Sequence, residues 1–344
     1  MSKKKNYNRN LQNAKKAKKD EFYTQLSDIE RELKHYKKHF RGKVVYCNCD
    51  DPRISNFFHY FSYNFEKLGL KKLIATCYKN QNMDLFSKNN SKKAVYLIYE
   101  GDKNGNNIPD REEIGIKDLK GDGDFRSNEC IELLKQADIV VTNPPFSLFR
   151  EYVAQLIEYD KKFIIVGSQN AVTYKEIFSL MKKNKIWVGY NSGDMSFKVP
   201  QHYPARKTRY WQDEKGQKWR SLGNICWFTN LDIAKRHEDL ILYKSYTPEE
   251  YPRYDNYDAI NVSKVAEIPI DYTGAMGVPI TFMDKYNPEQ FEILSSNDLR
   301  LNENVNYKEH GLIKDKDGTI NGKPTYVRIA VSYTHLRAHE TETN

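Results

Sequence analysis

The run from Ala137 to Phe146, with the sequence ADIVVTNPPF, constrains the fold more than any other segment of this chain. Its apolar stretch Ile139 to Val141 is typical of a parallel strand that is covered on both faces. Asn143 is followed by two prolines, which have no N–H group to donate to a sheet ladder. The run therefore predicts a buried central strand that ends abruptly at Asn143, with an aromatic ring just beyond its end.

The residues at the end of this strand offer hydrogen-bond acceptors to a ligand. Open α/β folds bind their ligands outside the carboxyl ends of the strands. There the side-chain oxygen of Asn143 and the carbonyl of Pro144 could accept both hydrogens of a planar NH2 group, while Phe146 stacks on the ring that carries it. An aromatic amine held in this way can attack an activated methyl group. The alternative is a structural turn with a surface aromatic.

Other segments extend this strand into a sheet. Residues 42–49 are rich in β-branched and aromatic side chains, and the acids and proline at 50–52 would end a first strand. The helical stretch Ser55 to Leu68 separates it from a second strand at 72–78, as in a β-α-β unit. Later strands are expected at 162–167, 185–190 and 224–229, with an antiparallel edge. We therefore predict an α/β fold with a doubly wound, mostly parallel sheet.

Several phrases of the sequence resemble one enzyme family. They are Asp20–Thr24 (DEFYT), Cys47–Pro52 (CNCDDP) with Asn56–Phe58 (NFF), the NPPF run, and Gly277–Phe282 (GVPITF). Together they resemble the EcoRI family of adenine-specific DNA methyltransferases over nearly the whole chain. The resemblance implies the S-adenosylmethionine-dependent methyltransferase fold with a smaller target-recognition region. It also implies methyl transfer from S-adenosylmethionine to N6 of a flipped-out adenine in double-stranded DNA.

The resemblance further implies roles for individual residues. The catalytic motif that holds the target base would be Asn143, Pro144, Pro145 and Phe146. The cofactor would be bound by Phe22, Tyr23, Thr24, Asp50, Asp51, Pro52, Asp124 and Phe125. In this assignment Phe22 and Tyr23 cap the cofactor, Asp51 and Pro52 shape its methionine pocket, and Asp124 accepts a hydrogen bond from its adenine amino group.

Two features depart from the general methyltransferase pattern. The loop after Pro52 reads RISN and lacks the glycines that usually let the backbone approach the cofactor. Tyr78 and Lys79 stand at the end of the second strand, where an acid commonly holds the ribose hydroxyls. The ribose contact therefore stays open. Asp50 is a candidate for it, and a helix-capping or solvated acid is the alternative.

Composition adds a preference for the partner and the compartment. The formal net charge of +9 favours a polyanionic partner, because lysine and arginine that neutralise phosphates release condensed counterions. Five scattered cysteines in a chain of 344 residues indicate a reducing cytosol rather than a disulfide framework. No apolar run approaches the ~20 residues that span a bilayer. A companion restriction endonuclease acting on the same DNA site is a further expectation.

Metal binding is not expected. Cys47 and Cys49 alternate along one strand and point to opposite faces, so they cannot hold one ion without distortion. Residues 102–113 place oxygen ligands at spacings that resemble a calcium loop. The glycine that such a loop needs at its sixth position is Asn107, and the preceding segment is a strand.

An insertion between the last two strands interleaves cations with aromatic residues. This pattern suits phosphate contact and base stacking, although a surface hairpin packed with amphipathic side chains is an equal alternative. The candidate nucleic-acid contacts are Lys198, Arg206, Lys207, Arg209, Tyr210, Trp211 and Arg220.

The expected organisation has four parts. Residues 1–19 form a basic, disordered arm that either stays solvated or follows a DNA groove. Residues 20–235 form the catalytic domain, with the insertion at 191–222. Residues 236–331 are assigned to target recognition. Residues 332–344 lose the bias of the preceding sequence and are expected to be a non-native tail.

Two alternative functions stay open at this point. The first is a methyltransferase of the same fold that acts on RNA or on a protein glutamine amide, which can use an Asn-Pro-Pro motif in the same way. The second is a non-catalytic, basic DNA-binding protein that has retained a methyltransferase fold. Identification of the methylated molecule separates the first, and cofactor affinity separates the second.

Overall fold

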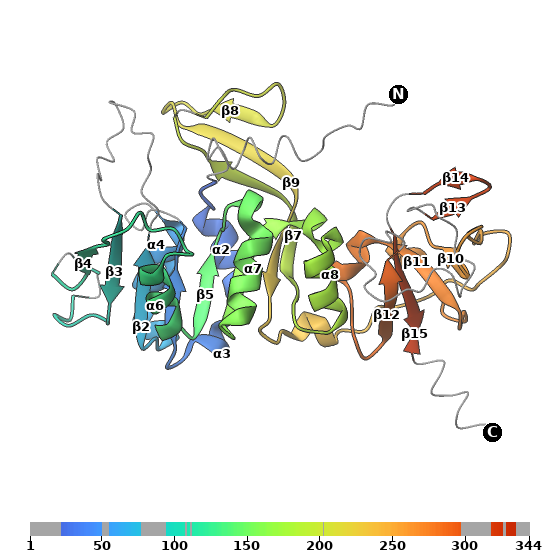
Figure 1. The fold of residues 1–344 in the computed structure, drawn as a ribbon, viewed down its shortest axis with the longest axis horizontal. Helices are drawn as coiled ribbons and strands as arrows, with labels where there is room; N and C mark the ends of the chain where they lie inside the picture. Colours follow the sequence, from blue (N-terminus) through green and yellow to red (C-terminus); the bar gives the residue numbers. More distant parts are fainter. Residues whose placement is uncertain are drawn as a thin grey trace. The chain divides into compact units, whose positions relative to one another are not determined.

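The chain divides into two compact units (Figure 1). The computed structural model describes residues 22–49, 55–76, 94–106, 109–110, 112–201, 203–296, 318–325 and 328–334. The first unit takes the described residues of 1–168 and 189–231, and the second takes those of 169–188 and 232–344. The segment 169–188, which the sequence analysis placed in the catalytic domain, belongs to the second unit. The arm at 1–19 lies outside the described residues.

The first unit is built on a sheet of nine described strands in the order β4-β3-β2-β1-β5-β6-β9-β7, with β8 paired to β9. The strands are β1 (Val44–Cys47), β2 (Lys72–Thr76), β3 (Val95–Tyr99), β4 (Gly115–Asp118), β5 (Ile139–Thr142), β6 (Lys162–Ser168), β7 (Trp187–Lys198), β8 (Tyr210–Gln212) and β9 (Lys218–Thr229). The central strands β2, β1, β5 and β6 are parallel. Strands β3 and β9 flank them in the antiparallel direction. The predicted α/β class with a parallel core is confirmed.

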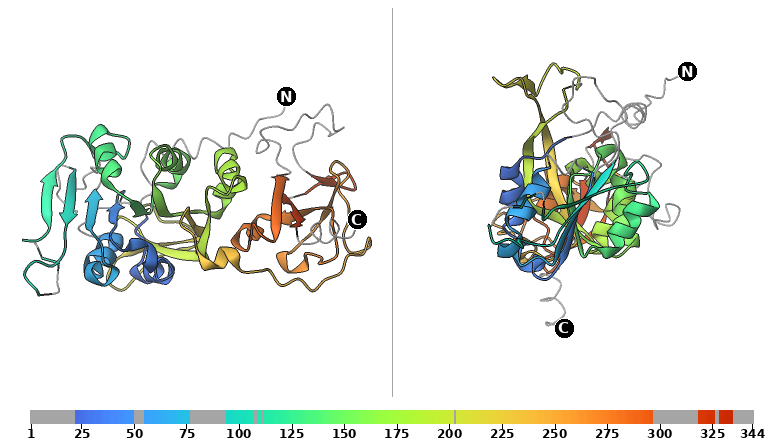
Figure 2. Two further views of the ribbon diagram at one scale, coloured as in Figure 1. Left: turned by 90° about the horizontal axis from the view of Figure 1, so that it is seen from below. Right: turned by 90° about the vertical axis from the view of Figure 1, so that its left-hand side faces the viewer.

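Helices cover both faces of this sheet. They are α2 (Leu26–Leu33), α3 (Lys37–Phe40), α4 (Asn56–Tyr63), α5 (Phe65–Leu68), α6 (Asn128–Gln136) and α7 (Phe149–Glu158). Figure 2 shows α2 to α5 in blue on one face and α6 and α7 in green on the other. Because no face of the central strands meets water, all four residues of β1 and of β5 are buried.

Strand β1 is the point at which the order of the strands in the sheet reverses relative to their order in the sequence. Strand β2 pairs with one edge of β1 and β5 pairs with the other, with Val45 opposite Ile139. The carboxyl ends of β1 and β5 therefore lie side by side at a topological switch point, where open α/β sheets bind ligands. The residues that follow these two ends are Asn48 and Asn143.

A buried carboxylate, that of Glu32, joins helix α2 to strand β7 through hydrogen bonds. The Glu32 side chain on α2 is fully buried, and it accepts hydrogen bonds from the Tyr36 hydroxyl at 2.8 Å and from the backbone N–H groups of Tyr190 and Asn191 at 2.8 Å each. The Asn191 side chain adds a fourth bond at 2.7 Å. A charge buried this deeply is tolerated because every bond it needs is supplied.

The second unit contains a smaller sheet with the order β10-β11-β15-β12 and a separate hairpin, β13-β14. Its elements are α8 (Lys175–Lys182), β10 (Ala259–Asn261), β11 (Ala275–Pro279), β12 (Phe291–Ser296), β13 (Thr319–Ile320), β14 (Lys323–Pro324) and β15 (Arg328–Tyr333), together with short 3-10 turns at Gln169–Thr173, Ala234–His237, Val265–Glu267 and Ile280–Asp284. Ser332 is fully buried and pairs with Glu292, and Tyr333 pairs with Phe291. Strand β15 thus extends two residues beyond the boundary predicted at 331.

Two features are absent from the described residues. None of the helices in the described ranges has the length and the apolar character that a membrane crossing requires. The same residues hold no group of three or more His, Cys, Asp or Glu side chains arranged for a metal ion. The cysteines in this part of the chain, Cys47, Cys49, Cys130 and Cys226, form no disulfide bond.

Gly167 is a position where the packed core leaves no room for a side chain. A Cβ atom added there would lie 2.6 Å from Phe149 Cε2 and 2.9 Å from Phe228 Cε2, and both rings are buried. We expect Gly167→Ala to lower the free energy of unfolding by about 1–3 kcal/mol, measured by urea denaturation. Gly115→Ala on the exposed strand β4, where the nearest atom is 3.7 Å away, is the control and should change stability by less than about 0.5 kcal/mol. Equal stability of the two variants would contradict this packing.

Candidate active site

Asn143 is held in one orientation at the end of β5. Its side chain is 6% exposed, and its Nδ2 donates a hydrogen bond of 2.6 Å to the backbone carbonyl of Phe22. A carbonyl oxygen can only accept, so the atom of Asn143 that faces it must be the NH2 nitrogen. The Oδ1 atom therefore points away from Phe22, and no residue in the described part of the chain donates a hydrogen bond to it.

Phe146 lies beside Asn143 in a single 3-10 turn, Phe146–Leu148. Its ring is half-buried and stacks on the ring of Phe22, with centroids 5.6 Å apart and an interplanar angle of 24°. Phe22 also meets Phe197 edge-on at 5.5 Å. Phe22, predicted to bind a cofactor, thus contacts two residues of the predicted catalytic motif.

The segment that carries Phe22 is anchored at two points, to strand β7 and to helix α4. Tyr23 forms a two-bond backbone bridge with Lys198 at the end of β7, with N···O distances of 2.9 Å and 3.2 Å. The carbonyl of Thr24 accepts a hydrogen bond of 2.7 Å from Nδ2 of Asn56, the first residue of α4. Thr24 is 2% exposed, and its buried hydroxyl has no hydrogen-bond partner among the described residues.

A second network joins the ends of β1 and β5. The Thr142 hydroxyl donates to the backbone carbonyl of Asn48, and the Tyr152 hydroxyl on α7 donates to Asn48 Oδ1. Burial raises the pKa of Tyr152 well above its usual range, so this hydroxyl stays protonated and remains a donor. The sequence analysis assigned no role to Asn48 or Tyr152. The only signal for Asn48 was its place directly after a buried strand, and Tyr152 looked like any other core residue of a helix.

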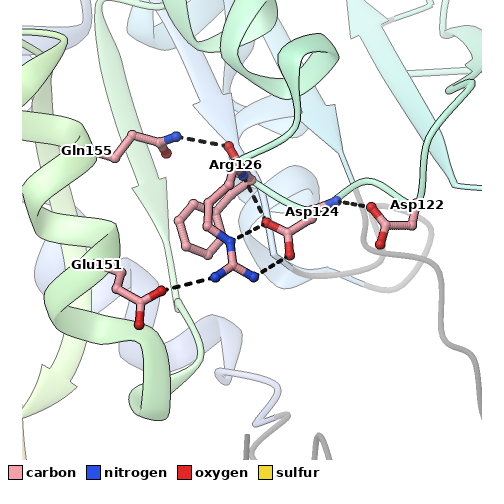
Figure 3. Close-up of polar contacts among 6 residues, drawn as sticks. Asp122, Asp124, Arg126, Glu151 and Gln155 are labelled. Atoms are coloured by element: carbon pink, nitrogen blue, oxygen red, sulfur yellow. Dashed lines mark hydrogen bonds and ion pairs between the residues drawn. The ribbon is translucent and has the colours of Figure 1, made fainter. Parts of the chain in front are cut away.

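The loop that contains Asp124 is held by charged side chains (Figure 3). Both oxygens of Asp124 accept hydrogen bonds from Arg126, at 2.9 Å from Nε and 2.7 Å from the terminal nitrogen. A third bond of 3.0 Å joins Arg126 to Glu151 on α7, and Asp122 accepts the backbone N–H of Asp124 at 3.0 Å. The hydrogen bonds that Arg126 donates to the Asp124 side chain raise the pKa of Arg126, which therefore stays charged.

Phe125, in the same loop, links this loop to the strand ends. Its ring is buried and meets the ring of Tyr152 edge-on at 5.0 Å, and its carbonyl accepts a hydrogen bond of 3.1 Å from Gln155 on α7 (Figure 3). Tyr152 in turn bonds to Asn48. The structure therefore connects Phe125 to the end of β5 through packed and bonded side chains.

The predicted nucleic-acid residues lie on a ribbon that projects from the sheet, formed by the outer parts of β7 and β9 with β8, residues 191–222 (Figure 1). The Trp211 and Trp219 rings are parallel across β8 and β9, with centroids 6.1 Å apart, and Lys198 lies over the Trp219 ring at 5.6 Å. Tyr210 is half-buried opposite Arg220. The ribbon thus presents stacked aromatic rings together with cations.

The cations of the ribbon differ in what they contact. Arg209 forms an ion pair of 2.9 Å with Asp194, and Arg220 donates to the backbone carbonyls of Thr208 and Arg209. Arg206 is exposed and lies over the Tyr203 ring at 5.9 Å, and Lys207 is also exposed. Arg206 and Lys207 are therefore the more accessible pair.

The structure brings together one part of the predicted site. Phe22 contacts both Asn143 and Phe146, and the backbone bridge from Tyr23 joins this group to Lys198 at the base of the ribbon. Asp124 and Phe125 lie in a neighbouring loop that reaches the strand ends through Tyr152. The remaining predicted cofactor residues, Asp50, Asp51 and Pro52, lie outside the described residues.

Comparison with known proteins gives concordant results. The type II methyltransferase M.EcoRI of Escherichia coli is 51% identical over 334 residues, which cover 96% of this chain and 98% of the relative. The type II methyltransferases M.MgeORF184P of Mycoplasma genitalium and M.MpnI of Mycoplasma pneumoniae are 40% and 39% identical over 331 residues, each match covering 92% of this chain and 96% of the relative. No solved structure matched the chain.

The sequence family described as "Adenine-specific methyltransferase EcoRI" matches residues 10–333, which include every described residue of the site. The parallel core of the first unit, with the predicted catalytic motif at the end of β5, agrees with that match. The chain belongs to the EcoRI family of adenine-specific methyltransferases.

Proposed function

We propose that this enzyme transfers a methyl group from S-adenosylmethionine to N6 of an adenine that has been flipped out of double-stranded DNA. The observation that carries the proposal is the orientation of Asn143. Its amide NH2 group is occupied by the Phe22 carbonyl, which leaves Oδ1 as an acceptor, and the half-buried ring of Phe146, three residues further along, stacks on the same Phe22.

The residues at the end of β5 suit an exocyclic amine. The N6 amine carries two hydrogens, and Oδ1 of Asn143 and the carbonyl of Pro144 can each accept one. Pairing of both hydrogens favours the positive charge that develops on nitrogen as it is methylated. Extrusion of the adenine costs a few kcal/mol, and stacking on the part of Phe146 that Phe22 leaves uncovered offsets some of this cost.

The described residues fit the cofactor. When bound, S-adenosylmethionine supplies the activated methyl group. Thr24 provides a buried hydroxyl that lacks a partner in the described part of the chain, and Phe22 and Phe125 provide aromatic surface near the ends of β1 and β5. We assign these three residues to cofactor binding, together with Tyr23. Asp50, Asp51 and Pro52 keep the roles that the family resemblance implies.

Asp124 is assigned to the adenine amino group of the cofactor. Arg126 donates two hydrogen bonds to Oδ1 of Asp124, from its backbone N–H and from Nε, and one to Oδ2 from its terminal nitrogen. The ion pair fixes the direction of the carboxylate, which favours a defined contact over a mobile one.

The DNA partner is assigned to two surfaces and the basic arm. The ribbon, residues 191–222, supplies phosphate contacts through Arg206 and Lys207 and stacking surface through Trp211. Region 236–331 is assigned to target recognition, and the arm at 1–19 to the backbone of DNA. The type II names of the relatives support a companion endonuclease that acts on the same site. The four cysteines of the described residues form no disulfide bond, which supports a cytosolic location.

Methyl transfer from labelled cofactor tests the substrate class. Duplex DNA, RNA and total protein are offered to the purified enzyme, and the labelled product is digested and identified. We expect label on N6-methyladenine from duplex DNA. Label only on RNA or on glutamine would establish the first alternative, and absence of cofactor binding would establish the non-catalytic alternative.

Removal of the Asn143 amide should abolish methylation without loss of the cofactor. We expect Asn143→Ala to lower kcat by about 10²-fold or more, because the acceptor for the developing charge is lost. Cofactor affinity, measured by calorimetry, should remain within about threefold of wild type, because Asn143 is assigned to the base. A large loss of affinity with an unchanged kcat would show that Asn143 belongs to the cofactor site.

Removal of the Asp124 carboxylate should have the opposite effect and weaken cofactor binding before it lowers kcat. We expect Asp124→Ala to weaken cofactor binding about tenfold or more, since a hydrogen bond to a charged group is lost. Arg126→Ala is the matched comparison, because it breaks the same ion pair and keeps the carboxylate. Equal losses of affinity in the two variants would indicate that Asp124 only shapes the loop.

The two accessible cations of the ribbon should contribute to DNA affinity through phosphates. Arg206→Ala and Lys207→Ala should each weaken binding to any duplex sequence and reduce the slope of log K against log salt by about 1. The control is Lys117→Ala on strand β4, which lies at the opposite edge of the sheet and should leave the slope unchanged. An unchanged slope in the two ribbon variants would remove these residues from the DNA interface.

A further inference from the structure

We propose that Asn56 is a positioning residue for methyl transfer. Through the segment Phe22–Thr24 it orients the side-chain amide of Asn143. The inference rests on the proposed function, because it concerns the oxygen of Asn143 that accepts a hydrogen from the substrate amine. It assigns to α4 the task of holding the segment Phe22–Thr24, whose Phe22 carbonyl accepts the hydrogen bond from Asn143.

The first step concerns the two orientations of an asparagine amide. Rotation by half a turn about the last side-chain bond exchanges the positions of Oδ1 and Nδ2. Only one orientation offers an acceptor to the substrate amine, because the NH2 group can only donate. In the structure the Phe22 carbonyl selects the productive orientation through its 2.6 Å bond to Nδ2.

The second step concerns the position of the Phe22 carbonyl. The backbone on its carboxyl side is held at two points, by the Tyr23 bridge to Lys198 and by the bond from Asn56 to the Thr24 carbonyl. The bridge uses backbone atoms only, so no substitution removes it cleanly. The Asn56 bond comes from a side chain and can be deleted alone.

The third step concerns the rigidity of Asn56. It is the first residue of α4, and the next residue, Phe57, is 1% exposed and meets the buried Trp227 ring edge-on at 6.1 Å. The donor therefore projects from a helix that is packed into the core. Within the described residues Asn56 makes no hydrogen bond or ring contact with Asn143 or Phe146, so its influence passes through Phe22–Thr24.

Kinetics of matched asparagine variants test the proposal. Asn56→Ala removes the bond to Thr24, and Asn64→Ala removes an equivalent amide-to-carbonyl bond of 2.8 Å, from Asn64 to Tyr60, at the other end of α4. We expect kcat to fall about tenfold to a hundredfold in Asn56→Ala, because a small displacement of a reacting group has effects of this order. KM for duplex DNA and cofactor affinity should stay within about threefold. Asn64→Ala should keep the wild-type kcat.

Asn56→Asp is a second variant that removes the hydrogen-bond donor, for the case that Asn56→Ala does not fold. An acidic residue is favourable in the first turn of a helix, so α4 should remain stable, while the carboxylate has no hydrogen to donate to the Thr24 carbonyl. We expect the same loss of kcat as in Asn56→Ala. Melting temperatures of all variants report whether the fold is retained.

The side-chain NH2 signal of Asn143 in an NMR spectrum provides a readout that does not depend on activity. The signal is assigned by its absence in Asn143→Ala. We expect one strongly hydrogen-bonded proton in the wild type and in Asn64→Ala, and its loss in Asn56→Ala and Asn56→Asp. This pattern would establish that Asn56 orients the amide.

Two results would overturn the proposal. One is a wild-type kcat in both folded Asn56 variants, and the other is an Asn143 signal that is unchanged in them. Failure of the proposed function is a separate result, because a wild-type enzyme that methylates no adenine refutes that function while the NMR signal still reports on the orientation of Asn143.

Discussion

The abrupt end of strand β5 is the constraint on which the site depends. Pairing with β1 and β6 buries the strand on both edges and both faces, and the two prolines prevent the ladder from continuing. Asn143 is therefore a polar residue left buried at a broken strand. An unpaired NH2 group there would be costly, so the amide must find an acceptor, and the Phe22 carbonyl supplies it. The same bond that satisfies the buried donor turns Oδ1 of Asn143 away from Phe22.

Around the end of β5, the buried hydrogen bonds join uncharged groups, and the ion pairs lie at the surface. Asn48, Thr142 and Tyr152 join the ends of the two central strands through buried groups that do not ionise at neutral pH. The ion pairs of Arg126 with Asp124 and Glu151 lie where water reaches them. This division suits a site whose chemistry is placement of two reactants, because neutral buried networks hold geometry without the cost of desolvating a charge.

The sequence predicted the central strands and several outer strands of the large sheet, and it did not predict strand β4. The parallel strands β1, β2, β5 and β6 were found because burial on both faces leaves continuous apolar runs. Strand β4 was not predicted, because its four residues are all exposed at the sheet edge and carry no apolar pattern. The grouping of segment 169–188 with the second unit was also missed, since it depends on contacts between residues far apart in the chain.

The sequence by itself determined that a buried strand stops at Asn-Pro-Pro-Phe, and it contains the phrases by which the chain resembles its family. Only the tertiary structure decided how Asn143 is oriented. Its partner is a backbone carbonyl 121 positions away, and a backbone carbonyl is the same in every residue, so no sequence pattern marks it. The anchoring of that carbonyl through Asn56 and Lys198 has the same origin, because these contacts exist only once the sheet has brought α4, β7 and the segment Phe22–Thr24 together.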